Sequence, residues 1–237
     1  MTRRRWIADE VAGDRAALTG AHATHLSRVL RVQMGQEFDV ACGEVVRLGT
    51  VTSASDARVE FALGGEVAAS EATPITLLLA VFKFDRMEWA IEKCTELNAT
   101  TIVPVIARRT EKHLALAAEK RVERWRRIAR EAAQQSRRTD VPEIAEPVKL
   151  ADILSVAADL RLVLAETEKE AQLSEILRGR PEASSIVLAI GPEGGWAPEE
   201  LALFDKAGWI SASLGSTILR AETAAIAALA IARAEMG

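Results

Sequence analysis

The chain has 237 residues, of which 49% are hydrophobic and 27% are charged, and its net charge is −4. This composition is typical of a globular protein, and the length allows one large domain or a small domain followed by a medium one. The longest strictly apolar run, residues 224–232, is far shorter than the roughly 20 residues of a membrane span. No long apolar region follows the basic residues 1–6, so neither a signal peptide nor a membrane partner is expected, and we predict a cytoplasmic protein.

The negative net charge argues against a nucleic-acid-binding protein, which usually carries a basic domain. One segment departs from that average, because residues 120–138 hold eight basic side chains and only two acidic ones, Glu123 and Glu131. Such a segment forms either a basic face for an anionic partner or a solvated helix face with Arg–Glu pairs, and charge alone does not separate the two. The basic side chains are Lys120, Arg121, Arg124, Arg126, Arg127, Arg130, Arg137 and Arg138.

Residues 1–70 predict a small β-rich domain. Three short segments rich in Val, Thr and Phe, with turn residues between them, indicate strands at 37–42, 45–53 and 57–63. Before them, residues 21–31 predict a helix that buries Leu26, Val29 and Leu30 on one face and turns His25, Arg28 and Arg31 toward solvent. Gly64-Gly65 and residues 70–74 are typical of a linker.

A different pattern begins at Ile75 and predicts a second domain, residues 73–237. The continuous apolar run 75–84 indicates a strand buried on both faces, and a helix with Asp85 as N-cap and Asn98 as left-handed C-cap follows. Strands and helices then alternate, which predicts an α/β domain with a doubly wound, unknotted parallel sheet. The later strands are expected at 101–107, 160–165, 185–190 and 210–214, and the later helices at 118–135, 170–178, 198–207 and 222–235.

Ligands of open parallel sheets bind outside the carboxyl ends of the strands, and three such ends stand out here: 165–167, 190–195 and 214–223. The loop Gly191-Pro192-Glu193-Gly194-Gly195 lacks the lysine of a P-loop and the G-x-G-x-x-G spacing. Its glycines let the backbone approach a ligand closely, and Glu193 suits a cationic ligand or one that offers hydroxyl donors. A bulky side chain at Gly194 is expected to close this approach. The alternative is an ordinary tight turn.

A second loop carries apolar residues where loops are usually polar. Ile218 and Leu219 lie between a strand end and a helix start, so they are expected to bury and could line an apolar slot for an adenine ring. Arg220 and Glu222 are expected at its mouth; the alternative is a short buried connector with a surface ion pair.

Nucleophilic and metal chemistry have little support. The three histidines match no zinc spacing, the G-x-S-x-G elbow is missing, and the two cysteines, Cys42 and Cys94, are expected to be reduced and buried. No metal is therefore predicted.

The motifs together resemble a known family. "IGPEGGW..EEL" followed by "LG.TILRAETAA" is similar to the SPOUT superfamily of methyltransferases, and more narrowly to the ribosomal RNA small-subunit methyltransferase E family, which methylates N3 of a uridine in 16S rRNA. "KFDRMEWAIEKCTELNATTIVPV", "RWRRIAREAAQQSRRTDVPEI" and "HLSRVLR" resemble further parts of this family, in order from about residue 22 onward.

This resemblance implies an N-terminal PUA-like β-barrel that binds RNA and a C-terminal trefoil-knotted parallel α/β domain. It also implies a homodimer, S-adenosyl-L-methionine (SAM) as methyl donor, and 16S rRNA of the small ribosomal subunit as partner. The implied cofactor-binding residues are Leu164, Ala165, Glu166, Ile190, Gly191, Pro192, Glu193, Gly194, Gly195, Leu214, Gly215, Ile218, Leu219 and Thr223.

The chain departs from the family pattern at four positions. Family members commonly have glycine in place of Phe84 and Arg137, a basic residue in place of Asp140 and arginine in place of Thr217, so the RNA contacts at Asp140 and Thr217 do not carry over. We expect basic side chains to hold backbone phosphates, which position RNA without reading its sequence. These are Arg28, Arg31, Arg127, Arg130, Arg137 and Arg138.

The expected chemistry is an in-line methyl transfer that needs no metal. Arg220 is the candidate that stabilises charge on the uracil carbonyls, and Glu222 either orients Arg220 or accepts the N3 proton. Two alternatives stay open: another SPOUT enzyme that modifies tRNA or a 2′-hydroxyl, and a non-catalytic RNA-binding protein with a vestigial knot.

Overall fold

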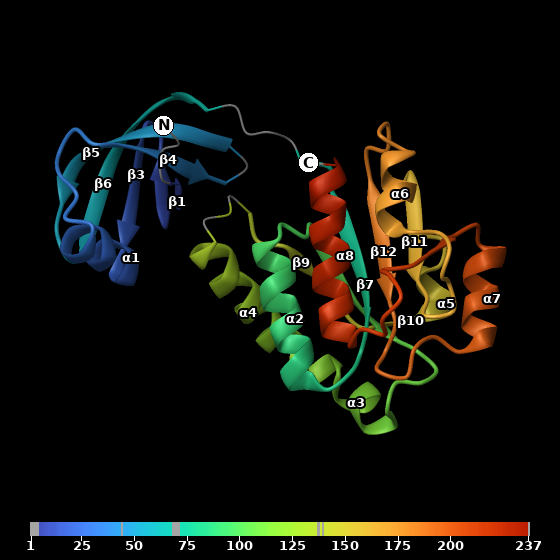
Figure 1. Cartoon of the computed structure of the whole chain (residues 1–237). Helices are drawn as coiled ribbons and strands as arrows, with labels where there is room; N and C mark the ends of the chain where they lie inside the picture. The colour runs from blue at the N-terminus through green and yellow to red at the C-terminus, as the bar shows by residue number, and fades with distance from the viewer. Residues whose placement is uncertain (1–4, 44, 68–71, 137, 139, 237) are drawn as a thin grey trace. The chain divides into compact units, whose positions relative to one another are not determined.

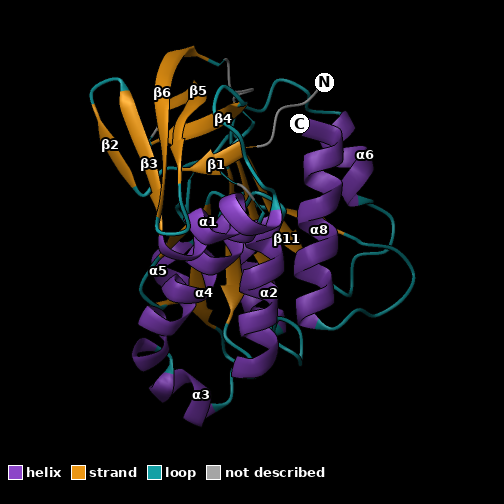
Figure 2. Ribbon diagram, turned by 90° about the vertical axis from the view of Figure 1, so that its left-hand side faces the viewer, coloured by secondary structure: helices purple, strands orange, loops and turns teal. Residues whose placement is uncertain are grey.

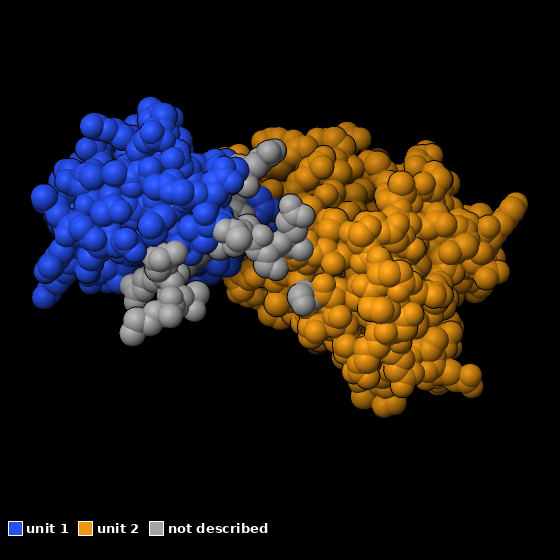
Figure 3. All heavy atoms as spheres, turned by 90° about the horizontal axis from the view of Figure 1, so that it is seen from above, with its two compact units in different colours: residues 1–71, 133–140 blue, residues 72–132, 141–237 orange. Residues whose placement is uncertain are grey.

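The computed structural model of the chain describes residues 5–43, 45–67, 72–136, 138 and 140–236. The chain forms two compact units, which Figure 3 colours separately. The first unit comprises Met1–Glu71 and Ala133–Asp140, and the second comprises Ala72–Ala132 and Val141–Gly237. The assignment of residues 133–140 to the first unit has no counterpart in the sequence pattern.

The first unit is built on a curled six-stranded sheet with the order β1-β4-β5-β6-β3-β2, whose strands are all labelled in Figure 2 (see also Figure 1). Its neighbouring strands are antiparallel except for β1 and β4, which are parallel. Inward-facing side chains such as Val40, Val51 and Phe61 form its core. The strands are β1 (Arg5–Ile7), β2 (Glu10–Ala12), β3 (Arg15–Thr19), β4 (Glu37–Cys42), β5 (Val45–Ala54) and β6 (Arg58–Glu66).

The three strands expected in this region are present as β4, β5 and β6. Strands β1, β2 and β3 were not predicted, because each is short and carries charged residues. All three residues of β2 are exposed, so that strand shows no apolar alternation.

The expected helix 21–31 is shorter and less regular than predicted. It consists of α1 (Gly20–Thr24) and one turn of π-helix, η1 (His25–Val29). A π-turn shifts the helical register by one residue, so Leu26 is buried but Val29 is 66% exposed, against the prediction. Arg31 lies outside the helix with a φ of +49°.

The second unit is built on a seven-stranded, wholly parallel sheet. The strand order is β10-β8-β7-β12-β11-β13, with β9 also paired to β8. The predicted parallel sheet is therefore confirmed. Its strands are β7 (Ile75–Ala80), β8 (Thr101–Ile106), β9 (Glu143–Ile144), β10 (Val148–Lys149), β11 (Leu160–Leu164), β12 (Ile186–Ile190) and β13 (Ile210–Ala212).

Helices cover both faces of this sheet, as the continuous apolar strands require. Alternate strand residues, such as Leu77 and Leu79, face the cluster that holds α2, α4, α6 and α8. Those between them, such as Leu78, face the cluster with α5, α7 and two buried tryptophans. The helices are α2 (Phe84–Glu96), α3 (Lys112–Ala117), α4 (Val122–Gln135), α5 (Leu150–Ile153), α6 (Leu173–Arg178), α7 (Pro198–Lys206) and α8 (Ala221–Met236).

Three predicted helix starts are wrong. Helix α6, expected from residue 170, begins at Leu173 with Gln172 as its N-cap. The first helix of this unit begins at Phe84, with Lys83 as its N-cap, so Asp85 lies in the first turn, where its charge still favours the positive end of the helix. The helix expected at 118–135 is interrupted: a short 3₁₀ turn, η2 (Glu119–Arg121), precedes α4.

The last helix returns the chain from the edge of the sheet to its centre. After β13, α8 packs against α2 and α6 and over β7 and β12. The guanidinium of Arg233 donates to the backbone oxygens of Thr73 and Asn98, which lie before β7 and after α2. Helix α8 therefore holds both ends of the first strand–helix unit. No helix within the described ranges is long and apolar enough to cross a membrane.

Both cysteines are free thiols, as expected, but only Cys94 is fully buried. Burial in the α2 core raises the pKa of the Cys94 thiol to about 12, so it remains protonated and unreactive near neutral pH. Cys42 is half-buried.

The end of α2 offers a test of backbone strain. Asn98 has a φ of +66°, as its predicted role as left-handed C-cap requires. Asn98→Ala is expected to lower the free energy of unfolding by about 1–2 kcal/mol, because this conformation strains a residue with a Cβ that lacks the compensating side-chain polarity. Asn98→Gly is the control and is expected to match or exceed the wild type in urea unfolding. Equal stability of the two variants would contradict this account.

Candidate active site

A cavity of about 290 Å³ lies in the second unit at the carboxyl ends of β11, β12 and β13. Three segments line it, residues 164–169, 190–192 with 195–196, and 212–219 with Ala221, and Arg109 adds a side chain from the loop after β8. The register of the parallel strands explains why these segments lie together, since Val163 pairs with Ala189 and Leu164 pairs with Ala212. The three strand ends therefore reach the same level of the sheet.

Most of the residues expected to bind a cofactor line this one cavity. Glu193, Gly194 and Thr223 do not, although each is close in sequence to residues that do. The predicted residues in the lining are Leu164, Ala165, Glu166, Ile190, Gly191, Pro192, Gly195, Leu214, Gly215, Ile218 and Leu219.

The backbone of the glycine loop, residues 191–195, packs closely on its surroundings. A Cβ at Gly191 would lie 3.3 Å from both the backbone nitrogen and the indole ring of Trp196, which is buried. Gly195 has a φ of +68°, which glycine adopts at no steric cost, and it faces the carboxylate of Glu166. By contrast, a Cβ at Gly194 would meet only the Arg109 side chain, at 3.4 Å. The tight position is therefore Gly191 and not Gly194.

The carboxylate of Glu193 is held by basic side chains of α2 and its N-cap. Arg86 Nη1 donates to Glu193 Oε1 at 2.8 Å, and Lys83 Nζ lies 3.9 Å from Oε2. These contacts draw the side chain of Glu193 out of the lining, so the loop presents backbone and glycine to the cavity. Arg86 was not among the residues that the sequence singled out, because its partner lies 107 positions away.

Glu222 is buried at the start of α8, with only 4% of its surface exposed. Its Oε1 lies 3.9 Å from Arg86 Nε, which is too long for a hydrogen bond, and its Oε2 has no hydrogen-bond partner within the described part of the chain. A buried carboxylate is costly unless charge or donors compensate it, so Arg86 supplies nearby charge while one oxygen stays available.

Arg220 lies one residue before α8 and is exposed. Its backbone oxygen accepts a hydrogen bond from the amide of Ala224, and no ion pair among the described residues joins its guanidinium to Glu222. The structure thus pairs Glu222 with Arg86 in place of Arg220. Ile218, which was expected to bury, is 79% exposed at the cavity lining, whereas Leu219 is half-buried. A ligand in the cavity would cover the exposed side chain of Ile218.

Two further carboxylates fix the loops around the cavity. Glu168 Oε1 accepts hydrogen bonds from the amides of Lys169, Glu170 and Ala171, and these bonds hold the pKa of the Glu168 carboxyl below its usual range. Glu200 is buried, and its two oxygens accept from the amides of Ala197 and Arg108. Glu200 therefore caps α7 and ties it to the loop that carries Arg109.

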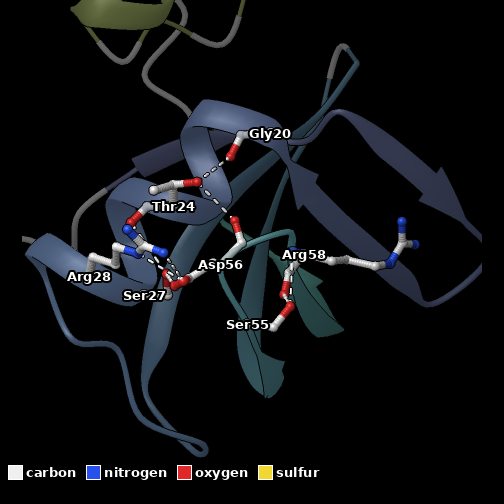
Figure 4. A network of polar contacts seen from close by, with 7 residues as sticks. All are labelled: Gly20, Thr24, Ser27, Arg28, Ser55, Asp56 and Arg58. Carbon is white, nitrogen blue, oxygen red and sulfur yellow. Dashed lines mark hydrogen bonds and ion pairs between the residues drawn. The ribbon is translucent and has the colours of Figure 1, made fainter.

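In the first unit, Arg28 is engaged with an acidic neighbour. Its Nε donates to Asp56 Oδ2 at 2.8 Å, and Ser27 Oγ donates to Asp56 Oδ1 (Figure 4). The hydrogen bond from Arg28 is the main cause that lowers the pKa of the Asp56 carboxyl. Thr24 Oγ1 donates to the backbone oxygens of Gly20 and Asp56, so this network joins α1 and η1 to the β5–β6 turn. Arg28 remains 69% exposed, and Arg31 is exposed.

Only some of the basic side chains of residues 120–138 are exposed to solvent. Arg127 and Arg130 are exposed on α4, with Arg127 4.0 Å from Glu131, while Arg138 is buried and bound to Asp140 at 2.7 Å. Asp140 thus forms an ion pair with a basic side chain of the same segment. Arg137, also expected to bind RNA, lies outside the described residues.

Phe84 has a packing role in this chain. Its ring makes an edge contact with the buried Trp125, at 6.0 Å between centroids, and the Arg121 guanidinium lies 4.7 Å above it. Phe84 therefore joins the start of α2 to the basic segment. His22, His25 and His113 join no group of metal-binding residues in the described ranges.

Comparison with known proteins places the chain in a family. The family model described as an RNA methyltransferase domain matches residues 69–233. Ribosomal RNA small subunit methyltransferase E of Synechocystis sp. is 34% identical, over 90% of this chain and 71% of the relative. The protein of the same name from Bacillus subtilis is 31% identical, over 90% of this chain and 87% of the relative. The chain belongs to the ribosomal RNA small subunit methyltransferase E family.

Solved structures agree with this membership. Ribosomal RNA small subunit methyltransferase E of Neisseria gonorrhoeae, bound to SAM, matches with a TM-score of 0.77 and 28% identity over 100% of this chain and 98% of that one. A methyltransferase of Legionella pneumophila in complex with SAM matches with a TM-score of 0.73 and 28% identity over 99% and 98% of the two chains. The methyltransferase E fold therefore extends over both units of the chain.

The glycine loop gives a test of its packing in this family member. Gly191→Ala is expected to lower the free energy of unfolding by about 1–3 kcal/mol, because its Cβ overpacks the buried Trp196. Gly194→Ala is the matched control and is expected to stay within about 0.5 kcal/mol of the wild type, because its Cβ would meet only the Arg109 side chain, at 3.4 Å, and no backbone atom. Chemical denaturation measures both, and a larger loss for Gly194→Ala would overturn this assignment.

Proposed function

We propose that this chain transfers a methyl group from SAM to N3 of a uridine in 16S rRNA of the small ribosomal subunit. The observation that carries the proposal is the meeting of three loops around one cavity at the strand ends, where most of the expected cofactor residues form the lining. Membership of the methyltransferase E family supports the same activity, and relatives of similar fold are described as bound to SAM.

The lining suits SAM better than a nucleotide polyphosphate. SAM combines an adenine ring with a sulfonium, an ammonium and a carboxylate, so it needs apolar surface and charges of both signs. Ile190, Leu214 and Leu219 supply apolar surface, and Glu166, Arg109 and Lys169 supply the charges. Glu193, which would repel a pyrophosphate, is drawn away to Arg86 and leaves backbone facing the ligand.

When bound, SAM supplies an activated methyl group on a positive sulfur. The chain's own task is to place the acceptor nitrogen in line with that group and to manage the proton of N3. Arg220 is exposed beside the cavity and would stabilise negative charge on the uracil carbonyls. Glu222 Oε2, which is buried and unpartnered among the described residues, would accept the N3 proton. Its pairing with Arg86 favours this role over the orientation of Arg220.

The RNA is expected to contact exposed basic side chains on both units. Arg28, Arg31, Arg127 and Arg130 are exposed and could hold phosphates, whereas the buried Arg138 would position the loop that carries it. The curled sheet of the first unit supports a PUA-like RNA-binding barrel. The target base would have to be splayed out of its stack to reach the cavity.

The proposed architecture also includes the trefoil knot and the homodimer of the SPOUT superfamily, in a cytoplasmic enzyme. The return of α8 to the centre of the sheet supports a knot, because the segment at Ser213 pairs with the segment at Gln172 before the chain turns inward. Titration of the oligomeric state by sedimentation would test the dimer.

Mass mapping of methylated RNA tests the reaction. The purified protein, supplied with SAM and 30S subunits from cells that lack the modification, is expected to add one methyl group to N3 of a uridine in 16S rRNA. Free 16S rRNA and tRNA are the comparison substrates. Methylation of tRNA or of a 2′-hydroxyl would replace the proposal with another SPOUT activity, and SAM-independent RNA binding without methylation would indicate a non-catalytic protein.

Arg220 provides the sharper mutational test. Arg220→Ala is expected to keep the SAM affinity of the wild type, because Arg220 is absent from the lining, and to lower turnover on 30S subunits by about 10²–10³-fold, as loss of one charge-stabilising donor does. Calorimetry measures the affinity and methyl incorporation measures the turnover. Wild-type turnover in this variant would remove Arg220 from the mechanism.

A further inference from the structure

The glycine loop needs external support to keep one conformation. Three of its five residues are glycine, so the free loop has more backbone freedom to lose than any other lining segment of similar length. Its sequence neighbours give only limited restraint, since the amide of Gly195 bonds to Pro192 within the loop itself. Side chains from other elements must therefore fix its place against the sheet.

One support comes from α2. Arg86 Nη1 bonds to Glu193 Oε1 at 2.8 Å, and 31% and 30% of the two side chains remain exposed. Partial burial reduces screening by water and salt, so this pair is stronger than a fully exposed one. The same guanidinium has its Nε 3.9 Å from Glu222 Oε1, at the start of α8. Arg86 therefore lies between the glycine loop and the start of α8.

A second support comes from the loop after β8. Arg109 Nη1 donates to the backbone oxygen of Gly194 at 2.5 Å, which is a charge-assisted hydrogen bond. The loop that carries Arg109 is itself fixed, because the neighbouring Arg108 amide donates to the buried Glu200. Arg109 also lines the cavity. Two adjacent residues of the glycine loop are thus held from two different elements.

We propose that Arg86 and Arg109 form an arginine clamp that holds the glycine loop in its ligand-binding conformation. Arg86 is a positioning residue that acts through the loop, whereas Arg109 both positions the loop and lines the cavity. The inference rests on the proposed binding of SAM to this cavity. A loop that is already ordered loses less entropy when the ligand binds, so the clamp raises SAM affinity.

Loss of Arg86 and loss of Arg109 are expected to affect SAM affinity and kcat differently, which a general loss of folding would not do. Arg109 bonds to the glycine loop and lines the cavity, away from Glu222, so its loss is expected to weaken SAM binding with little change in kcat. Arg86 also supplies charge beside Glu222, so its loss is expected to weaken SAM binding and to lower kcat. This split between affinity and turnover separates positioning of the loop from a general loss of folding.

Calorimetric titration of the full chain with SAM tests the clamp. Arg86→Gln and Arg109→Gln are each expected to weaken binding about tenfold, with Arg86→Lys nearer to the wild type because it retains the charge. Glu193→Gln combined with Arg86→Gln is expected to be no weaker than Arg86→Gln alone, because both remove one interaction. Wild-type affinity in both single glutamine variants, or simple additivity of the pair, would overturn the clamp.

Two nearby cations serve as matched controls. Arg108→Gln changes the adjacent arginine, whose side chain contacts Glu199 on α7. Lys93→Gln changes a cation of α2 that pairs with Glu92 and Glu96, away from the cavity. Both are expected to bind SAM like the wild type, and an equal loss in either control would attribute the effect to net charge instead of the clamp.

Hydrogen exchange separates the clamp from the proposed function. In the ligand-free protein, the amides of residues 191–195 are expected to exchange faster in Arg86→Gln and Arg109→Gln than in the wild type and in both controls. Unchanged exchange would overturn the clamp even where SAM binds. A wild-type chain that binds no SAM would overturn the proposed function, and the exchange rates would still decide whether the two arginines hold the loop.

Discussion

The parallel pairing of β11 with β12 and β13 is the constraint on which the site depends. A parallel sheet places all its carboxyl ends along one edge, and the register here brings Leu164, Ile190 and Ala212 to nearly the same level. Segments that are far apart in sequence can then share one cavity. The glycine loop, the apolar lining and the buried Glu222 all take their positions from this edge.

The sequence predicted this architecture because its strongest signals are the ones that burial on two sides imposes. The predominantly apolar segments of β7, β8, β11 and β12 are hard to accommodate outside a covered parallel sheet. The weak signals belong to the short strands β1, β2 and β3, whose residues are partly charged and exposed. Two deviations have local causes: the π-turn exposes Val29, and the start of α2 at Phe84 moves Asp85 into the first turn.

The composition of the lining was predictable to a similar degree, because glycines and apolar residues at strand ends are visible in a single sequence. The environment of its charged groups was not. Neither the attachment of Glu193 to Arg86 nor that of Gly194 to Arg109 has a local signature, since the partners lie 107 and 85 positions apart. The burial of Glu222 is equally invisible, because a glutamate in the first turn of a helix is usually a solvated residue that favours the helix dipole.

The position of α8 has a consequence for how the protein folds. Helix α8 packs over β7, the first strand of this sheet in the sequence, and Arg233 bonds it to Thr73 and Asn98. When α8 docks, it therefore forms contacts between residues that are very far apart in the sequence. Such contacts form late and slowly. Until they form, the apolar face beneath α8 is uncovered and the segment that supplies Leu214, Leu219 and Glu222 is not in place. A ligand of this cavity therefore binds only the fully folded protein, and its binding free energy stabilises the chain after α8 has docked.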